Sequence, residues 1–195
     1  MVEPIRDKEL INKAAEVLRE DRSEQGERRY LLFLTGLFLG RRVCDMRKMH
    51  VGDVLGREKF VIIEQKTGKR IELFISKKLR KAYKERLAGR DPEEWLFPSP
   101  DPDKVTGKQK PICYRTLLRD MQEVKAIMKL PADYNIGTHS LRKTFGYHYY
   151  RETHDVATLM KLFNHSKEET TLIYIGIASD EIKAAFLKVD RMYDT

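Results

Sequence analysis

The spacing of apolar side chains predicts a chain that is mostly helical. Leu10, Ala14 and Leu18 fall on one face of a helix over 7–20, and Asp7 is placed to cap its first turn. The same helical spacing returns along most of the chain. It predicts further helices over 30–39, 41–49, 77–87, 112–128, 139–152, 156–163, 167–174 and 180–189.

The stretch over 30–39 is apolar throughout. Its length is about half of what a membrane span needs, so we interpret it as a fully buried core helix. Gly36 is expected to interrupt this helix, and Gly40 to end it. The preceding stretch over 21–29 is polar and is predicted to be a connector.

One region changes to the pattern of β-strands. The runs over 59–65 and 70–75 are rich in β-branched and aromatic residues, and Lys66-Thr67-Gly68-Lys69 between them is typical of a tight turn. Asp53 and Val54 are candidates for a third strand. The sequence therefore predicts an α+β fold, mostly α-helical, with a small two- or three-stranded antiparallel sheet.

The segment 89–111 contains five of the seven prolines and is predicted to be a long surface loop, mobile over 101–110. Neither half of the chain looks self-sufficient, so we expect one domain over its 195 residues. The 35% of charged residues and 41% of hydrophobic residues are typical of a globular protein, and exclude a collagen-like or wholly disordered chain.

Charge changes the picture, because 38 Lys and Arg face 30 Asp and Glu, a net charge of +8. A basic balance favours an anionic partner such as nucleic acid, although it also serves solubility alone. The charged N-terminus over 1–21 is not a signal peptide. Cys44 and Cys113 are too few for a disulfide scaffold, so we expect reduced thiols in a cytoplasmic protein.

The segment Thr138 to Arg142 is a candidate phosphate site. His139 and Arg142 are three residues apart, so they share a helix face, and Thr138 or Ser140 is expected to cap that helix. A helix N-terminus and a guanidinium both attract a phosphate. A surface histidine and arginine at a helix start would give the same pattern, so the segment alone does not decide.

Three other segments place polar residues beside apolar runs. Arg42 follows the buried helix, where its charge needs a partner, and Asp45 is placed to orient it. Lys66 lies at the turn of the predicted hairpin. His165 interrupts an apolar helix end, and Tyr174 follows nine residues later. An ion pair, a solvated turn lysine and a half-buried core tyrosine would each explain these residues in structural terms.

Taken together, the segments resemble the catalytic domain of tyrosine recombinases, the phage integrase family. Each motif alone is weak, but their order and gaps fit the family across nearly the whole chain. The motifs are Gly40-Arg41-Arg42 with Asp53-Val54, Lys66-Thr67-Gly68, His139-Ser140-Leu141-Arg142, and Leu162-Phe163-Asn164-His165-Ser166 followed by Tyr174.

Two positions of this match need an explanation. The family usually has Gly where this chain has Asn164, but Asn tolerates a left-handed backbone, so the turn is expected to survive. Arg42 is chosen over Arg41 because it lies 11 residues before Asp53, the usual gap of the family.

The resemblance implies the fold of a DNA breaking-rejoining enzyme and a reaction that uses neither a metal ion nor ATP. Arg42 and Arg142 would stabilise the charge on the non-bridging oxygens of a phosphodiester. His139 and His165 would add hydrogen bonds or proton transfer. Tyr174 would attack the phosphorus and form a covalent 3′-phosphotyrosine.

Two proton transfers follow from that assignment. A free tyrosine has a pKa of about 10, so Tyr174 needs a base or nearby positive charge, and His139 is the natural candidate. The leaving 5′-oxygen needs a proton, and the resemblance assigns this role to Lys66, with Lys69 as the alternative.

The remaining positive charge is expected to contact the backbone of double-stranded DNA without reading its sequence. A solvated basic surface would explain each of these residues equally well. The candidates are Arg41, Lys69, Lys77, Lys78, Arg80, Lys81, Lys104, Lys108, Lys110 and Lys143.

Family members usually carry an N-terminal helical domain that clamps the DNA. Only about forty residues precede Arg42, so this domain is expected to be absent from the chain. We therefore predict weak, salt-sensitive DNA binding by the chain alone. The stripe of Ile182, Phe186 and Val189 either packs on its own core or, as is frequent in the family, docks on a neighbouring subunit of a homo-oligomer, a tetramer on DNA.

Three other functions stay open from the sequence. A monomeric topoisomerase would use the same tyrosine to relax DNA. A degenerate recombinase could act as a non-catalytic DNA-binding regulator. A helical protein-interaction domain explains the basic charge poorly and the motifs not at all.

Overall fold

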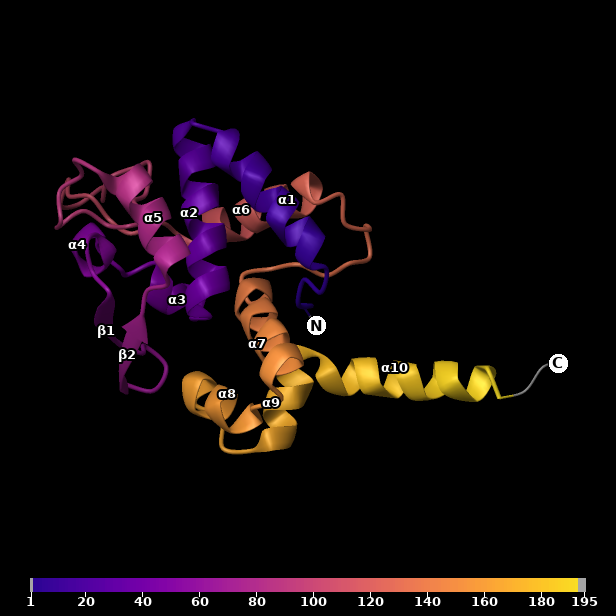
Figure 1. Cartoon of the computed structure of the whole chain (residues 1–195). Coiled ribbons are helices and arrows are strands. Elements are labelled where there is room, and N and C mark those ends of the chain that lie inside the picture. The colour runs from indigo at the N-terminus through magenta and orange to yellow at the C-terminus, as the bar shows by residue number, and fades with distance from the viewer. Residues whose placement is uncertain (1, 193–195) are drawn as a thin grey trace.

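The structure, a computed structural model, describes residues 2–192 (Figure 1). Helices dominate, and a single hairpin of two strands interrupts them. In chain order the elements are α1 (Lys8–Glu20), α2 (Glu24–Leu39), α3 (Val43–Met46), α4 (Val51–Val54), β1 (Lys59–Ile63), β2 (Arg70–Phe74), α5 (Lys77–Leu87), α6 (Tyr114–Ile127), α7 (Ser140–Thr153), α8 (Val156–Phe163), α9 (Glu168–Ile175) and α10 (Ile177–Asp190).

The predicted fold class is confirmed, with two strands rather than three. β1 and β2 pair antiparallel, and Phe60 faces Leu73 in the register. The segment proposed as a third strand forms the short helix α4 instead. Its Asp53 side chain accepts a hydrogen bond from the backbone N–H of His50 at 2.7 Å, which closes a helical turn.

Helix α2 is longer than predicted, and its polar start is the segment that we interpreted as a connector. Ser23 caps it by accepting from the N–H of Gly26 at 3.0 Å. Gly36 does not interrupt the helix. A side-chain carbon at Gly36 would lie 2.5 Å from Leu141, so the glycine lets α7 pack closely against α2. The helix predicted over 41–49 shrinks to the four residues of α3.

The buried apolar side chains form two clusters. The larger one gathers around α2, whose Leu32 and Phe33 are buried, and it includes the inner face of the hairpin. The smaller one lies among α7, α8 and α9 and contains Tyr147, Leu159, Phe163, Ile175 and Ile177. The two clusters meet where α7 packs along α2.

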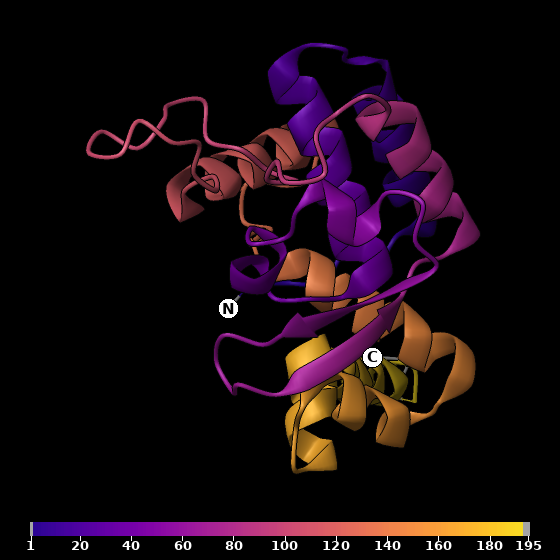
Figure 2. The same ribbon diagram turned by 90° about the vertical axis from the view of Figure 1, so that its left-hand side faces the viewer.

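The hairpin, the long loop and α10 reach outward from this body. In Figure 2 the hairpin crosses in front of α8 and α9, and the loop over 89–111 projects to one side. Helix α10 extends away from the rest of the chain (Figure 1). Its Ile182 and Phe186 are 61% and 74% exposed, so the alternative in which this stripe packs on its own core is wrong.

Within residues 2–192, no helix is long and apolar enough to cross a membrane. Cys44 and Cys113 are both free thiols, as predicted.

Candidate active site

The end of α2 brings the first predicted arginine to the centre of the molecule. Gly40 ends α2 in the left-handed conformation, with φ at 58°, and the chain then turns so that Arg42 precedes α3. The carbonyl of Gly40 accepts a hydrogen bond from Nη1 of Arg142 at 2.9 Å. The segments carrying Arg42 and Arg142, a hundred residues apart in the sequence, therefore meet directly.

Arg142 is almost fully buried and holds three elements together. Besides the Gly40 carbonyl, it donates to the carbonyl of Phe163 at 3.1 Å, and its guanidinium lies 4.2 Å from the centre of the Phe163 ring. Burial lowers the pKa of Arg142 to about 10, and the positive charges of Arg41 and Arg42 add to this effect. It stays charged at neutral pH.

Arg42 is partly exposed and pairs with Glu64, not with Asp45 as we expected. Its Nη1 lies 2.9 Å from Oε1 of Glu64. Asp45 accepts instead from the backbone N–H of Gln65 at 2.9 Å, so it ties α3 to the hairpin turn. Arg42 pairs with Glu64 rather than with Asp45 because the hairpin places the fully buried Glu64 carboxylate beside the Arg42 guanidinium.

The predicted nucleophile and its predicted base lie together. Nδ1 of His139 is 3.3 Å from the hydroxyl oxygen of Tyr174. The Tyr174 ring also packs edge-on against Phe163 and His165, with ring centres 5.6 Å and 5.4 Å away. The ammonium of Lys143 lies 5.0 Å from the centre of the Tyr174 ring.

Burial and nearby positive charge shift the pKa of Tyr174 in opposite directions but shift that of His139 in the same direction. Burial raises the pKa of Tyr174, and the nearby Arg142 and Arg42 offset part of that rise. The phenol is therefore protonated at neutral pH. Much of the His139 side chain remains exposed, but loss of water around it, with the positive charges of Arg142 and Arg42, lowers its pKa. A neutral His139 is able to accept a proton from Tyr174.

His165 is oriented by a buried threonine. Its Nδ1 lies 3.0 Å from Oγ1 of Thr171, which also lies 3.3 Å from the carbonyl oxygen of Lys167. The contact with Thr171 fixes the imidazole ring and leaves Nε2 for a substrate. When Nδ1 accepts from the Thr171 hydroxyl, Nε2 carries the hydrogen of the neutral ring and can donate it to a phosphate oxygen. Burial, followed by the charges of Arg142 and Arg42, lowers the pKa of His165.

The hairpin turn carries the two candidate lysines past α8. Lys66 is exposed at the turn, and its charge makes a small contribution to the lowered pKa of His139 and of His165, after burial and the charges of Arg142 and Arg42. Lys69 donates to Oδ1 of Asn164 at 2.5 Å. Asn164 has φ at 54°, so it adopts the left-handed turn that we expected.

Two candidates for contacting the DNA backbone are buried instead. Arg41 is 1% exposed and donates to the carbonyl of Leu39 at 3.3 Å and to that of Leu162. Lys143 is 4% exposed, beside the Tyr174 ring. Neither side chain is available to a DNA backbone at the surface, so both predictions are wrong. The other candidates lie at the surface.

The predicted caps of α7 are also wrong. His139 is its N-cap residue and makes no capping bond with its side chain. The Ser140 hydroxyl accepts from the N–H of Gly137 at 3.1 Å, and the Thr138 hydroxyl lies 2.9 Å from that of Tyr114. These bonds fix the loop before α7 and leave the His139 ring free to face Tyr174.

The sequence did not reveal Glu64, Lys143 and Thr171 as parts of this site. Glu64 had a usable signal, because it continues the inward-facing alternation of Phe60 and Ile62, where a charge needs a buried partner. Lys143 and Thr171 had none, because each is one polar residue on a helix whose packing faces cannot be assigned from spacing alone.

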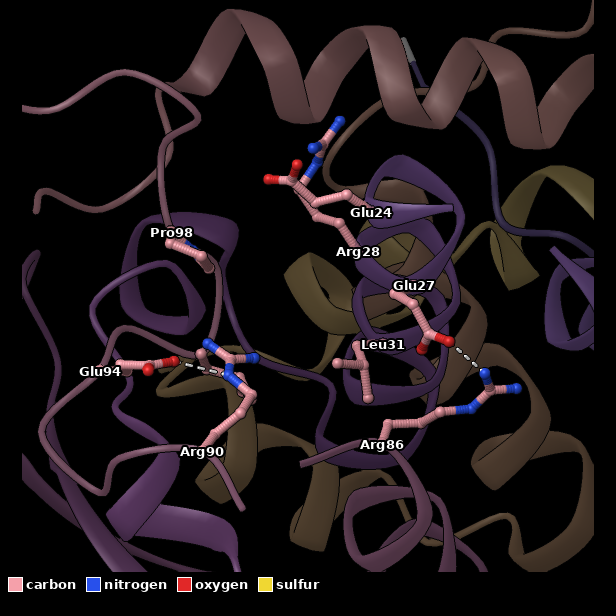
Figure 3. A pocket seen from close by; sticks show the side chains of 9 residues that line it. Glu24, Glu27, Arg28, Leu31, Arg86, Arg90, Glu94 and Pro98 are labelled. Carbon is pink, nitrogen blue, oxygen red and sulfur yellow. Dashed lines mark hydrogen bonds and ion pairs between the residues drawn. The ribbon is translucent and has the colours of Figure 1, made fainter. Parts of the chain in front are cut away.

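A cavity beside the N-terminal half of α2 contains none of the predicted residues (Figure 3). Its volume is about 310 Å³, and two ion pairs lie within its lining. Arg86 contacts Glu27, and Arg90 lies 2.8 Å from Glu94. Within residues 2–192, no group of three or more histidine, cysteine or carboxylate side chains is arranged to hold a metal ion.

Comparison with known proteins identifies the family of the chain. Residues 7–181 match the Phage integrase family. The chain is 34% identical over 186 residues to a probable integrase/recombinase, YoeC, of Bacillus subtilis (strain 168), covering 95% of this chain and 96% of that protein. It is 26% identical over 162 residues to a tyrosine recombinase of Pseudothermotoga lettingae, covering 82% of this chain and 53% of that protein.

Solved structures show the same fold at low sequence identity. The XerA recombinase matches with a TM-score of 0.70 and 17% identity, over 96% of this chain and 65% of that one. The catalytic domain of bacteriophage HP1 integrase matches with a TM-score of 0.58 and 16% identity, over 95% and 94%. The chain therefore belongs to the phage integrase family of tyrosine-type site-specific recombinases and has the fold of their catalytic domain.

Proposed function

We propose that this chain cleaves and rejoins duplex DNA through Tyr174, with Arg42, Lys66, His139, Arg142 and His165 acting on the same phosphate. The observation that carries this proposal is the 3.3 Å approach of His139 to the Tyr174 hydroxyl beside the buried charge of Arg142. A phenol, a neutral base and fixed positive charge are what attack on a phosphodiester needs.

The first step forms one bond to phosphorus and breaks another. The Tyr174 oxygen attacks the phosphorus while its proton passes to Nδ1 of His139. Arg42, Arg142 and His165 stabilise the charge that grows on the non-bridging oxygens. The 5′-oxygen of the broken strand leaves with a proton from Lys66. The product is a 3′-phosphotyrosine and a free 5′-hydroxyl.

The second step reverses the first with a different strand. A 5′-hydroxyl of the partner DNA attacks the phosphotyrosine and gives its proton to the neutral Lys66, and Tyr174 leaves with the proton returned by His139. The phosphodiester energy is kept in the covalent link, so the exchange needs no ATP. The positive charges supply the stabilisation that a metal ion gives in other phosphoryl-transfer sites.

The surface lysines provide the remaining attraction to DNA. The side chains of Lys77, Lys78 and Lys108 are exposed, and that of Lys110 is half-buried. Their contacts would be with phosphates, so binding is expected to weaken steeply with salt. A basic protein that acts on DNA is expected in the cytoplasm, where the DNA of a prokaryotic cell lies.

Assembly into a homo-oligomer is proposed through α10. Its exposed apolar residues include Phe186 and Leu187, at 74% and 48%. The same chain has an apolar groove between α1, α2 and α7, lined in part by Phe38, Phe145 and Tyr149. A helix from one copy seated in the groove of the next would cover both surfaces in a head-to-tail contact, the type of contact from which rings are built.

The experiment is capture of a covalent adduct on a nicked duplex whose bases around the nick are randomised. The short fragment released after cleavage diffuses away, so the phosphotyrosine accumulates and is visible on a denaturing gel. We expect wild-type chain and Tyr150→Phe to form the adduct and Tyr174→Phe to form none. An equal adduct with Tyr174→Phe would refute the assignment of the nucleophile.

The alternative functions give different results in related assays. A topoisomerase would relax supercoiled plasmid without pairing two duplexes, so a synapsis assay separates it from a recombinase. A non-catalytic regulator would bind duplex but form no adduct on any member of the randomised pool.

A further inference from the structure

Glu64 is a buried acidic residue that the proposed mechanism leaves without a role. It directly follows β1 and extends the inward-facing row of Phe60 and Ile62. Its side chain is 0% exposed. A carboxylate at such a position is tolerated only when its oxygens are paired, because burial of an unpaired charge costs several kcal/mol.

Both oxygens of Glu64 are paired, and with different parts of the site. Oε1 lies 2.9 Å from Nη1 of Arg42 and 3.5 Å from Nη1 of Arg41. Oε2 accepts from the hydroxyl of Thr67 at 2.9 Å. Thr67 directly follows Lys66 in the turn, so one carboxylate joins Arg42 to the lysine-bearing turn.

The backbone of Glu64 strengthens that connection. Its N–H donates to the carbonyl of Lys69 at 3.0 Å, and its carbonyl accepts from the N–H of Gly68 at 2.8 Å. Both backbone hydrogen-bonding groups of Glu64 are therefore paired with residues of the turn. A movement of Glu64 must move Arg42 and Lys66 together.

We propose that Glu64 is a positioning residue that fixes the distance between Arg42 and Lys66. The inference rests on the proposed function, in which Arg42 acts on the non-bridging oxygens and Lys66 on the leaving oxygen of one phosphate. Such groups need placement to within about 0.5 Å, and a misplacement of about 1 Å can cost on the order of 100-fold in rate. A carboxylate shared by both is a direct way to set their separation.

The charge of Glu64 has a second consequence for the same site. Burial lowers the pKa values of Arg41 and Arg142, the charge of Arg42 lowers both further, and Glu64 counteracts this for both. It therefore reduces the repulsion among guanidinium groups gathered before any DNA phosphate arrives.

The test uses substitutions that separate the two contacts of Glu64. Glu64→Gln keeps the shape and removes the charge that holds Arg42. Thr67→Val removes only the hydroxyl that joins Glu64 to the turn, and Thr67→Ser restores it. Glu72→Gln is the matched control, because Glu72 lies on the same hairpin, is exposed, and pairs with Lys59 at 3.0 Å.

The substrate is the randomised nicked duplex, made with either oxygen or sulfur at the 5′-bridging position of the scissile phosphate. A thiol has a pKa of about 8.5, so sulfur leaves as a thiolate and needs no proton from Lys66. We expect Thr67→Val to slow adduct formation about tenfold with the oxygen substrate. With the sulfur substrate its rate should return to that of wild type. Thr67→Ser should react like wild type with both substrates.

Glu64→Gln is expected to slow adduct formation at least about tenfold with both substrates, because Arg42 is displaced as well. Affinity for the nicked duplex should stay within about twofold of wild type, since most phosphate contacts lie elsewhere. Hydrogen exchange at the Gln65 to Lys69 amides should be faster in Glu64→Gln and unchanged in Glu72→Gln.

Three results would overturn the proposal: an adduct rate for Glu64→Gln within twofold of wild type, an equal loss for Thr67→Val with oxygen and sulfur, or unchanged exchange at the turn. If wild-type chain forms no adduct, the proposed function fails by itself. The exchange measurement then still decides whether Glu64 holds the turn, with faster exchange supporting it and unchanged exchange refuting it.

Discussion

The two sides of the active site rest on different supports. Arg42 and the Lys66 turn are anchored to the larger apolar cluster around α2, through Glu64 and the Gly40 turn. His165 and Tyr174 rest on the smaller cluster among α7, α8 and α9, which has five buried apolar residues. Arg142 connects the two sides by its bonds to the carbonyls of Gly40 and Phe163.

This difference predicts that one side of the site stays rigid during the reaction and that the other side moves. Charges held in advance by a rigid frame stabilise a transition state without reorganising, so the arginine side gains from the larger core. Elements with few buried apolar contacts open most easily, so the tyrosine side is the one expected to move. The proposed nucleophile, Tyr174, would have to attack, stay covalently bound and then be released, and it would gain from that freedom.

The largest expected effect comes from removing the link between the two sides. Arg142→Gln leaves two buried carbonyls without their donors, which costs about 1–3 kcal/mol each, and removes a charge from the phosphate. We expect a lower Tm and a loss of adduct of at least about 100-fold. Arg151→Gln, an exposed position on the same helix, is the control. A rate for Arg142→Gln close to wild type would contradict the conclusion that Arg142 connects the two sides of the site.

A smaller effect is expected from disturbing the tyrosine side alone. A methyl group at Gly146 would lie 2.7 Å from Ile175 and 2.8 Å from Phe163, so Gly146→Ala overpacks the smaller cluster. The expected cost is about 1–3 kcal/mol, with faster hydrogen exchange over 156–176 and slower adduct formation. Exchange over 30–39 should not change. Equal acceleration in both segments would show that the two sides form one unit.

The pH dependence sharpens the assignment of His139. Its lowered pKa keeps it neutral, so adduct formation should decline only at a pH below the ordinary histidine value of about 6.5. Lys66→Met removes one of the charges that lower this pKa, so the decline should move to higher pH. The sulfur substrate keeps the rate measurable in this variant, and Lys59→Met is the control. If adduct formation by Lys66→Met declines at the same pH as that of wild type, His139 is not the base.

The same lowered pKa values predict how stability changes with pH. The unfolded chain binds protons on His139 and His165 at a higher pH than the folded chain does. The contribution of these two residues to the free energy of unfolding therefore falls as the pH drops below about 6.5. Urea denaturation of wild type and His165→Gln across this range measures it. A contribution that rises toward acid pH would contradict these shifts.

The smallest effect is expected at Asn164. Asn164→Ala forces a side chain without a local hydrogen bond into the left-handed conformation, at a cost of about 1 kcal/mol in the free energy of unfolding. Asn164→Gly frees the backbone but loses the exposed bond to Lys69, so it should be close to neutral. Chemical denaturation of both variants compares them. A glycine variant less stable than the alanine variant would show that the Lys69 contact dominates.

The sequence predicted the helices and the hairpin well where the pattern was local. The apolar stripe of α8 gave its bounds, 156–163, without error. The start of α2 was missed because its first turns expose polar residues such as Glu24 and Gln25, and only the packing of the other face shows that they are helical. Asp53 was misassigned because the strand pattern of two residues cannot outweigh a capping bond.

The sequence named residues that the structure brings together at the candidate site, but it did not predict how they are connected. The order of the motifs pointed to Arg42, His139 and Tyr174. The alternation along β1 marks Glu64 as buried, but its pairing with Arg42 was not predictable, because Glu64 lies 22 residues away and reaches Arg42 only after the hairpin folds back. Likewise, the burial of Lys143 depends on how α7 meets α9, a tertiary contact that spacing along one helix does not encode.

The most direct test of the account is to locate the covalent bond by mass spectrometry. Wild-type chain trapped on the randomised nicked duplex is digested with nuclease and trypsin, and the peptide that carries the residual nucleotide is sequenced by fragmentation. We expect the nucleotide on Tyr174 within the peptide 168–183, attached through a 3′-phosphate. A nucleotide on any other residue, or attachment through a 5′-phosphate, would contradict it.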